Sequence, residues 1–515
     1  MKKSKYNLLF KVVSLIFFTA FVFYACGGVD PDYIYYTVTF DSMGANEKPE
    51  SQTVYPGYKI IQPKGLKNSV LELDGWYREK TFVTKWNFAS DNPSKDMTLY
   101  ARWVLKDLTG LQDYFDDKEE EGDDKEKPLR LPIAVNLGMM ETDNSVLDNI
   151  IEVIAEKDKF VILDLSLSAV VSGIFNLGYE HEGKAKIVEL VLPEEAEELY
   201  GKMGYINLEA DKDEDKFISV LESIRGTGIV NIATQLFVLD GINSQLVEDI
   251  VEASLKTVDF PNVKNIFGYT FYGCTALEDV NIPELVYIGE RTFVDCISLE
   301  TVDFPKAEYI GKNAFAGCEK LKEANFPLAA HIDNKAFEGC IALESLDLPI
   351  VVIIGNYAFA DCEILEEASF PLVTAIGDSA FAGCEALEKI CFPKAVTIGS
   401  EAFASCEKLK TVSFPLVTDI GDSAFEGCAA LETAAFPIVE TIGSKAFFDC
   451  DEFKEITFGT EPPEFPVSGE VFLGGTPDDF TINRPAASGD AYDEWFNEKS
   501  ENFNNDGNSI KFKDF

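Results

Sequence analysis

A cysteine recurs every 22 residues through the second half of this chain, and this spacing restricts the fold more than any other feature. A phenylalanine stands three residues before each cysteine, an isoleucine stands eight before it, and a Phe-Pro, Ile-Pro or Leu-Pro pair opens each unit. A fixed period of about 20 to 50 residues indicates a solenoid or an array, because each unit buries its apolar side only against its neighbours. We therefore predict a parallel β-solenoid of nine coils. The nine cysteines are Cys274, Cys296, Cys318, Cys340, Cys362, Cys384, Cys406, Cys428 and Cys450.

Each unit can be interpreted as one coil with an apolar interior. In the second unit Pro283 ends a short strand, since proline cannot donate to a ladder of hydrogen bonds. Gly289 is expected to permit a backbone turn that other residues would strain. Phe293 fills the centre of the coil. The remaining inward positions are Leu277, Val280, Ile282, Leu285, Ile288, Cys296 and Leu299.

The strand pattern L-x-x-L-x-L and the signature I-G-x-x-A-F-x-x-C-x-x-L resemble the BspA-like leucine-rich repeats of bacterial surface proteins, in all nine units. Departures occur at Phe267 and Asp333, which replace the glycine, and at Phe453, which replaces the last leucine. The resemblance implies an α/β repeat fold, a leucine-rich-repeat solenoid with 22-residue coils. It also implies a surface protein that binds host or neighbouring-cell proteins, although a scaffold alone does not fix a function.

The eleven cysteines of this chain would normally suggest disulfides in an exported protein. Nine of them occupy equivalent positions on successive coils, where parallel side chains seldom meet the torsion that a disulfide needs. We interpret them as buried free thiols, since small apolar cysteine packs well inside a core. Cys391 lies outside this series and is predicted to be an exposed thiol.

The first 26 residues have the pattern of a processing segment. A basic start precedes an apolar stretch from Val12 to Ala25, which is too short to span a bilayer comfortably and has the right length for a signal-peptide core. The following Cys26 resembles the lipidated cysteine of a bacterial lipobox. This resemblance implies a chain held at the cell surface, in the outer membrane, by a lipid on Cys26 and by no other membrane contact. An ordinary signal peptide is the alternative.

Residues 27–35 would then be a tether, and residues 36–104 a separate small β domain. The segments YTVTFDSMG, TVYPGYKI, LDGWYRE and MTLYARW resemble the internalin-type B-repeat, a β-grasp-like module of extracellular bacterial proteins. Residues 105–130 are strongly acidic and are predicted to be a solvated linker. Residues 131–255 are interpreted as divergent leucine-rich repeats with a cap, or alternatively as a separate α/β domain. Residues 256–458 hold the nine repeats, and residues 459–515 a C-terminal cap and tail.

The net charge of −45, from 89 acidic and 44 basic residues, argues against nucleic acid as a partner, because Lys and Arg must neutralise phosphates. Within the repeats, the variable strand positions should face solvent and form an extended surface. We predict that a partner with a basic patch docks on the acidic early coils. The alternatives are that these residues only keep the chain soluble, and that the protein is an envelope spacer without a dedicated ligand. The candidate surface comprises Glu278, Asp279, Glu300, Asp303, Glu323, Glu344, Asp347, Glu366 and Glu367.

Catalysis is not supported by any recognisable arrangement of residues. Only His181 and His331 exist, and no nucleophile-and-base set can be assembled around them. We expect neither an enzyme nor a cofactor. One weak calcium candidate has the spacing of an EF-hand loop, but Lys216 stands where that loop needs glycine, so acidic residues at a helix N-terminus are the simpler interpretation. It comprises Asp211, Asp213, Asp215 and Glu222.

Overall fold

The computed structural model of this chain divides into two compact units, residues 1–104 and residues 105–515. The residues that the structure describes are 35–43, 45, 47–80, 82, 84–118, 121–137, 145–170, 174–176, 186–194, 196, 198–200, 205–206, 217–218, 223–225, 231–232, 255–465, 471–472, 480–499 and 511–515. Each unit is described by itself below.

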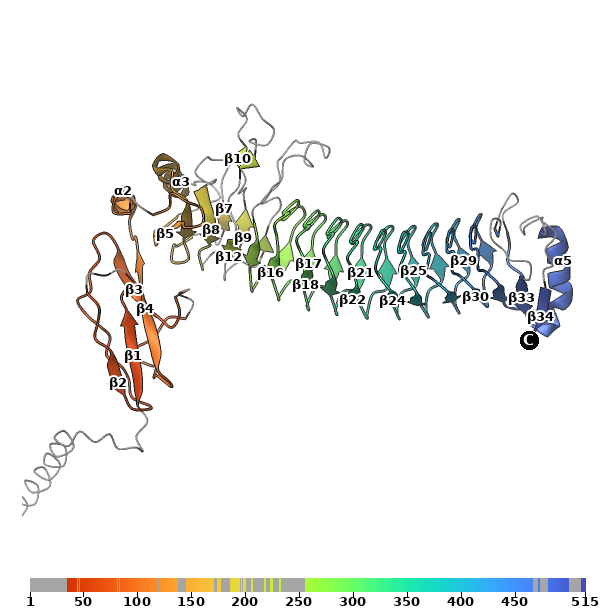
Figure 1. Ribbon diagram of the computed structural model, residues 1–515, viewed down its shortest axis with the longest axis horizontal. Coiled ribbons are helices and arrows are strands. Elements are labelled where there is room, and N and C mark those ends of the chain that lie inside the picture. The colour runs from red at the N-terminus through yellow and green to blue at the C-terminus, as the bar shows by residue number, and fades with distance from the viewer. Residues whose placement is uncertain are drawn as a thin grey trace, which may run out of the picture. The chain divides into compact units, whose positions relative to one another are not determined.

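The first unit is a four-stranded sheet in the order β2-β1-β4-β3 (Figure 1). Its strands are β1 (Tyr36–Asp41), β2 (Gln52–Val54), β3 (Glu72–Tyr77) and β4 (Met97–Val104). The central pair, β1 and β4, is parallel, and both outer pairs are antiparallel. Alternate residues of the strands point into an aromatic core, where Phe40 meets Trp76 edge-on at 5.1 Å between ring centroids.

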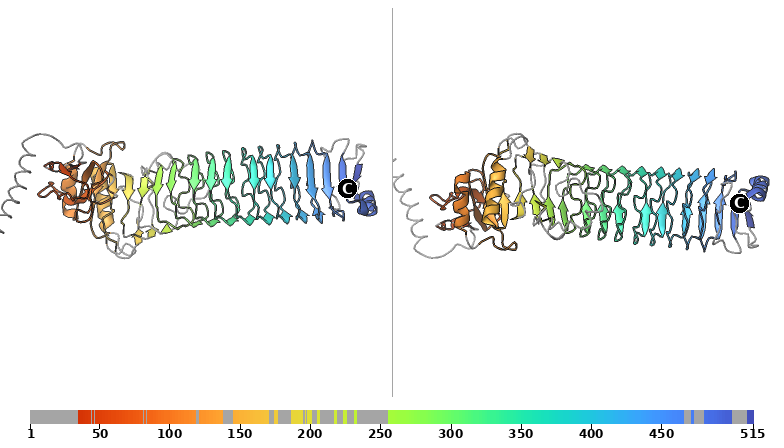
Figure 2. Two further views of the ribbon diagram at one scale, coloured as in Figure 1. Left: turned by 90° about the horizontal axis from the view of Figure 1, so that it is seen from below. Right: turned by 90° about the horizontal axis from the view of Figure 1, so that it is seen from above.

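The second unit is a stack of coils with two rows of short parallel strands, which run along its two long sides (Figure 2). Equivalent residues of neighbouring coils pair at an offset of 22, as Val258 pairs with Val280. The predicted leucine-rich-repeat solenoid is therefore confirmed. Among the described residues of the nine repeats the coils contain strands and turns, and the unit's helices lie outside them.

The first strand row of the repeats consists of β14 (Thr257–Asp259), β16 (Asp279–Asn281), β18 (Thr301–Asp303), β20 (Glu323–Asn325), β22 (Ser345–Asp347), β24 (Glu367–Ser369), β26 (Lys389–Cys391), β28 (Thr411–Ser413), β30 (Thr433–Phe436) and β32 (Glu455–Phe458). The second strand row consists of β15 (Asn265–Ile266), β17 (Tyr287–Ile288), β19 (Tyr309–Ile310), β21 (His331–Ile332), β23 (Ile353–Ile354), β25 (Ala375–Ile376), β27 (Thr397–Ile398), β29 (Asp419–Ile420) and β31 (Thr441–Ile442).

Both rows continue toward the N-terminus into the region without regular repeats. The first row takes in β5 (Leu129–Pro132), β6 (Val161–Asp164), β8 (Ile187–Val191) and β12 (Ser223–Arg225), all parallel to one another and to β14. The second row takes in β7 (Ile174–Asn176), β9 (Glu198–Tyr200) and β13 (Asn231–Ile232). A separate hairpin pairs β10 (Tyr205–Ile206) with β11 (Phe217–Ile218), and α3 (Ser145–Lys157) connects β5 to β6.

Part of the segment that we predicted to be a solvated acidic linker is folded. It holds the short helices η1 (Leu108–Gly110) and α2 (Leu111–Asp116), and Leu111, Tyr114 and Phe115 of α2 are buried. Leu105 extends the first strand row by bridging to Ile133. The acidic run that follows, from Asp116, dominates the composition of residues 105–130. The prediction was based on that composition and therefore overlooked the few apolar residues of α2.

The interior of the repeats is a column of stacked phenylalanines. Phe381 and Phe403, one coil apart, stack at 5.4 Å with an interplanar angle of 2°. The column continues past the last repeat, where Phe472 stacks on Phe447 at 5.4 Å although the sequence period has ended. Beyond it the stack finishes with β33 (Thr481–Arg484), η4 (Ala486–Ser488), α5 (Gly489–Lys499) and β34 (Lys511–Asp514). Tyr492 and Trp495 of α5 are buried.

The glycine of each repeat has a different role from the one we predicted. Gly289 does not adopt a left-handed conformation, but a Cβ atom built on it would lie 2.5 Å from the backbone nitrogen of Gly268 in the preceding coil. It is needed for close approach between coils rather than for a turn. The left-handed residue comes two positions later, as at Arg291 (φ 55°) and Lys335 (φ 60°).

Candidate functional site

The first strand row presents its variable side chains to solvent. The middle residue of each strand points inward, as the 3% exposure of Val302 shows, and its neighbours point outward. Of the nine predicted surface residues, Asp347 lies in β22 with its side chain outside the described part of the chain. The other eight are exposed: Glu278, Asp279, Glu300, Asp303, Glu323, Glu344, Glu366 and Glu367.

The 22-residue register places like positions one above another, so two lysines in this surface, Lys322 and Lys389, pair with glutamates of the preceding coil. Lys322 Nζ lies 2.8 Å from Glu300 Oε2, and Lys389 forms the same kind of pair with Glu367. The hydrogen bond and charge of Lys322 lower the pKa of Glu300, and Glu300 raises the pKa of Lys322 in return. The acidic character of the early coils is therefore partly neutralised within the surface itself.

A second column of this surface alternates between carboxylate and amide side chains. Asn281 Nδ2 donates to Asp259 Oδ1 at 2.7 Å, and Asn325 Nδ2 donates to Asp303 Oδ1 at 2.6 Å. We did not recognise this ladder from the sequence. The signal was present, because Asp and Asn alternate at intervals of 22 residues from Asp259 to Asp347.

The nine repeat cysteines contribute to the core and not to the surface. All nine are free and buried, whereas Cys391 in β26 is free and exposed. Burial raises the pKa of the Cys318 and Cys340 thiols. Each thiol from the second repeat onward also donates to the carbonyl oxygen of the phenylalanine one coil back, at 3.2 Å for Cys340 and Phe315. The repeated cysteine thus satisfies a backbone acceptor as well as filling space.

A half-buried pair of tyrosines in the second strand row, next to the exposed Phe267, was not predicted from the sequence. Tyr287 and Tyr309 occupy equivalent positions in β17 and β19, and their rings stack at 5.2 Å with an interplanar angle of 3°. The ring of Phe267, which follows β15, lies 6.1 Å from that of Tyr287. The hydroxyl of Tyr309 donates to Asp333 Oδ2 at 2.8 Å, and burial together with this hydrogen bond raises the pKa of Tyr309 to about 12. Asp333 is one of the two departures from the glycine position.

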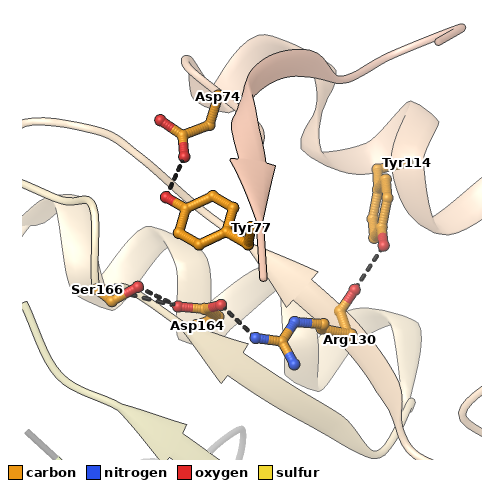
Figure 3. Close-up of polar contacts among 6 residues, drawn as sticks. All are labelled: Asp74, Tyr77, Tyr114, Arg130, Asp164 and Ser166. Carbon is orange, nitrogen blue, oxygen red and sulfur yellow. Dashed lines mark hydrogen bonds and ion pairs between the residues drawn. The ribbon is translucent and has the colours of Figure 1, made fainter. Parts of the chain in front are cut away.

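A buried polar cluster lies at the N-terminal end of the solenoid (Figure 3). Asp164, at the end of β6, is 1% exposed. Its carboxylate accepts a hydrogen bond from Arg130 Nη2 on the neighbouring strand at 2.6 Å and one from Ser166 Oγ at 2.6 Å. Tyr114 of α2 donates its hydroxyl proton to the carbonyl oxygen of Arg130. These contacts join α2 to the first strand row, so the cluster is structural in character.

The remaining candidates from the sequence fall largely outside the described residues. Cys26, His181 and the calcium candidate Asp211, Asp213, Asp215 and Glu222 all lie there. Within the described ranges, no three His, Cys, Asp or Glu side chains are grouped so that they could hold a metal ion. The same ranges contain no helix whose length and hydropathy would suit a membrane crossing. His331 is exposed in β21.

Comparison with known proteins gives matches to both units. Residues 251–350 and 330–454 match the family described as BspA type leucine rich repeat region. Residues 36–102 match the Listeria-Bacteroides repeat domain. Internalin H of Listeria monocytogenes is 38% identical over 79 residues, which are 15% of this chain and 14% of that protein. The matches to the curated relatives span only 8% to 14% of their length.

Solved structures with leucine-rich repeats are also similar to this chain. A leucine-rich repeat protein from Bacteroides ovatus is 22% identical, with a TM-score of 0.44, and the match covers 67% of this chain and 88% of that one. The pneumococcal vaccine antigen PcpA is 14% identical, with a TM-score of 0.35, over 68% of this chain and 86% of that one.

Proposed function

Residues 251–454 belong to the BspA-type leucine-rich repeats and residues 36–102 are a Listeria-Bacteroides repeat domain, and from this we propose that the chain is a cell-surface protein that binds other proteins. Leucine-rich repeats generally mediate contacts between proteins. The single observation that supports binding here is the outer face of the first strand row, where a rigid, repeated framework carries side chains that differ from coil to coil.

The charge of this face favours one kind of partner. Among the described residues, Glu344 and Glu366 have no lysine or arginine within ion-pair distance, whereas Glu300 and Glu367 are paired within the surface. The open carboxylates on the middle coils favour a partner with a basic patch, since complementary potentials steer association and suppress wrong partners. We infer that this partner is an extracellular protein, with host matrix proteins as the first class to test.

The attachment to the cell is a further part of the proposal. The apolar stretch before Cys26, and the position of that cysteine after a small residue, support a lipid anchor on Cys26. Such an anchor would attach the chain to a membrane without spanning it, and we place it in the outer membrane. Palmitate incorporation into the protein that is lost in Cys26→Ala tests the anchor separately from binding.

A pulldown with residues 27–515 against extracellular-matrix proteins tests binding. The variant Glu300→Lys/Glu344→Lys/Glu366→Lys is expected to weaken capture of any bound partner at least about tenfold. The matched control Glu319→Lys/Glu363→Lys/Glu385→Lys makes the same charge change at exposed glutamates in turns outside the strands, and should retain binding. Unchanged binding in the first variant would contradict the assignment of this face. A chain that is displayed at the surface and captures nothing would favour an envelope spacer.

A further inference from the structure

Three tyrosines form an exposed cluster at one end of the small β domain. The rings of Tyr35 and Tyr55 lie 4.7 Å apart between centroids, and those of Tyr55 and Tyr58 lie 6.1 Å apart. Their exposed fractions are 38% for Tyr35, 43% for Tyr55 and 66% for Tyr58. Ile61, which follows in the chain and bonds through its backbone to Gln52 of β2, is 75% exposed. This is a large amount of aromatic and aliphatic surface for a domain of this size.

The local backbone holds the cluster together. Tyr36 of β1 pairs with Val54 of β2, so Tyr35 and Tyr55 stand opposite each other one step beyond the ladder. Tyr58 follows a tight turn, in which its amide donates to the carbonyl of Tyr55 at 3.0 Å and Gly57 has a φ of 83°. The cluster is therefore built on an edge of the sheet and fixed by a turn, rather than carried on an irregular loop.

The sheet topology places this cluster where the chain enters the domain. Strands β1 and β4 run parallel, with Val38 opposite Met97, so the start of β1 and the start of β4 share one end of the sheet. The chain leaves the domain at Val104, the last residue of β4, which pairs with Glu72 at the opposite end. The tyrosines thus lie at the end of the sheet where β1 starts, opposite the end where the chain leaves the domain.

The length of that segment limits how far the cluster can be from an anchored cysteine. Nine residue steps separate Cys26 from Tyr35. A fully extended chain reaches at most about 3.5 Å per residue, so the cluster stays within about 30 Å of a lipid on Cys26, whatever conformation the segment takes. This distance is comparable to the thickness of the hydrocarbon core of one bilayer.

The charge distribution of the chain favours contact between the small β domain and a membrane. Residues 36–104 contain nine basic and eight acidic side chains, a net charge of +1, whereas the whole chain has a net charge of −45. Lys64 and Lys67, soon after Ile61, are exposed. Anionic lipid headgroups repel the acidic remainder of the chain but not this domain.

We propose that the cluster of Tyr35, Tyr55, Tyr58 and Ile61 rests in the headgroup layer of the bilayer that carries the lipid on Cys26. This contact deepens the proposed attachment and rests on it. Tyrosine is enriched at membrane interfaces because its ring is apolar and its hydroxyl remains hydrated. The cluster adds a second contact with the membrane to the single lipid attachment. Two contacts fix the orientation of the domain, so that the Val104 end of the sheet points away from the membrane.

The arrangement of these four side chains fits contact with a lipid surface better than binding of a glycan. A sugar ring packs on an open aromatic face, whereas Tyr35 and Tyr55 cover part of each other at 4.7 Å and their hydroxyl oxygens lie 3.3 Å apart. The exposed aliphatic side chain of Ile61 adds nothing to the recognition of sugar hydroxyls, but its transfer from water into the interfacial layer is favourable. Binding of a glycan is nevertheless one outcome that the experiment distinguishes.

The test uses residues 26–515 with Cys391→Ser, coupled through Cys26 to a maleimide phospholipid in vesicles of phosphatidylcholine and phosphatidylglycerol. Removing Cys391 leaves Cys26 as the reactive thiol, because the nine repeat cysteines are buried. The reporter is Tyr58→Trp. The four natural tryptophans, Trp76, Trp86, Trp103 and Trp495, also emit, but they should be quenched little by lipid because they are 1%, 3%, 6% and 8% exposed. The matched control is Glu72→Trp, an exposed site at the opposite end of the sheet.

Lipids brominated on their acyl chains quench tryptophan at the bilayer interface. We expect the Tyr58→Trp protein to lose at least about twice as much fluorescence as the Glu72→Trp protein. Equal losses from the two reporters, or no loss from either, would overturn the proposal. A blue shift of the Tyr58→Trp emission with soluble peptidoglycan fragments, in the absence of bilayer quenching, would overturn it in favour of a glycan. The chemical coupling supplies the anchor, so a failure here is separate from a failure of natural lipidation or of partner binding.

Discussion

The thiol of Cys318 donates a hydrogen bond of 3.0 Å to the backbone carbonyl of Phe293, one coil earlier in the solenoid. The same carbonyl also accepts from the amide of Cys296 within its own coil. A carbonyl oxygen has two lone pairs, and the repeat uses both. The contact recurs from Cys296 to Cys450, which ties successive coils together along the interior.

The buried thiols should be unreactive in the folded protein. Residues 27–515 contain ten cysteines, of which nine are buried and Cys391 is exposed. Titration with a disulfide reagent at pH 8 should therefore detect one thiol in the folded chain and ten in denaturant, because the thiolate is the reactive form and burial opposes it. The Cys391→Ser variant should give no fast reaction. Rapid modification of several thiols in the native chain would contradict the buried ladder.

The same thiols should make stability fall at high pH. Burial raises the pKa of Cys340, so the folded chain keeps this thiol neutral to a higher pH than the unfolded chain does. The resulting stabilisation is fully present below about pH 9 and is lost as the pH rises toward the folded-state pKa, by up to about 1.4 kcal/mol per pH unit and thiol. Urea midpoints at pH 8 and pH 10 should fall further for the natural chain than for Cys340→Ala, which itself costs about 1–2 kcal/mol at pH 8.

Two glycines of adjacent repeats, which occupy different positions of the 22-residue unit, should respond differently to substitution. A Cβ atom on Gly355 would lie 2.5 Å from the backbone nitrogen of Asn334, so Gly355→Ala should destabilise the chain by about 3 kcal/mol. Gly339 has a φ of 71°, but a Cβ atom on it would meet only ordinary van der Waals contacts at 3.8 Å, and asparagine tolerates that conformation. Gly339→Asn should cost less than about 1 kcal/mol. Urea unfolding of both variants measures the difference, and a reversed order would be inconsistent with close approach as the reason for Gly355.

The buried carboxylate of Asp164 should be important for the N-terminal end of the solenoid. Asp164→Ala removes the partner of Arg130 and of Ser166, and should cost about 2–3 kcal/mol, less than for a fully buried pair because the Arg130 side chain is 32% exposed. Asp164→Asn keeps an acceptor for Ser166 and should cost about half as much. Thermal unfolding followed by circular dichroism checks both values. Equal melting temperatures for the two variants and the natural chain would contradict the role of this cluster.

The solenoid could be predicted from the sequence because its coils repeat one pattern. The period itself, the inward direction of Phe293 and the burial of the cysteines follow from nine copies of one pattern. The second strand row was not predicted, because within the repeats each of its strands has only two residues and one inward side chain. The left-handed position occupied by Tyr269, Arg291 and Glu401 was also missed, since residues of such different types give no signal of a positive φ.

The candidate surface could be predicted only in part. Which residues face solvent follows from the alternation in a strand, and Glu278 and Glu366 are exposed as that alternation requires. The ion pair of Glu300 with Lys322 and the amide-to-carboxylate ladder depend on the offset between coils, which a single repeat does not reveal. The tyrosine cluster depends on the pairing of β1 with β2, which joins residues 20 positions apart in a domain that has no repeat.

The small β domain also has a mechanical property that follows from where the chain enters and leaves it. Tension between an anchored N-terminus and a captured partner would pull β1 and β4 in opposite directions along their length. Because these strands are central, adjacent and parallel, the hydrogen bonds from Val38 to Asp41 would be loaded together in shear rather than opened one at a time. The domain is therefore arranged to resist stretching, as a linker under load at a cell surface must do.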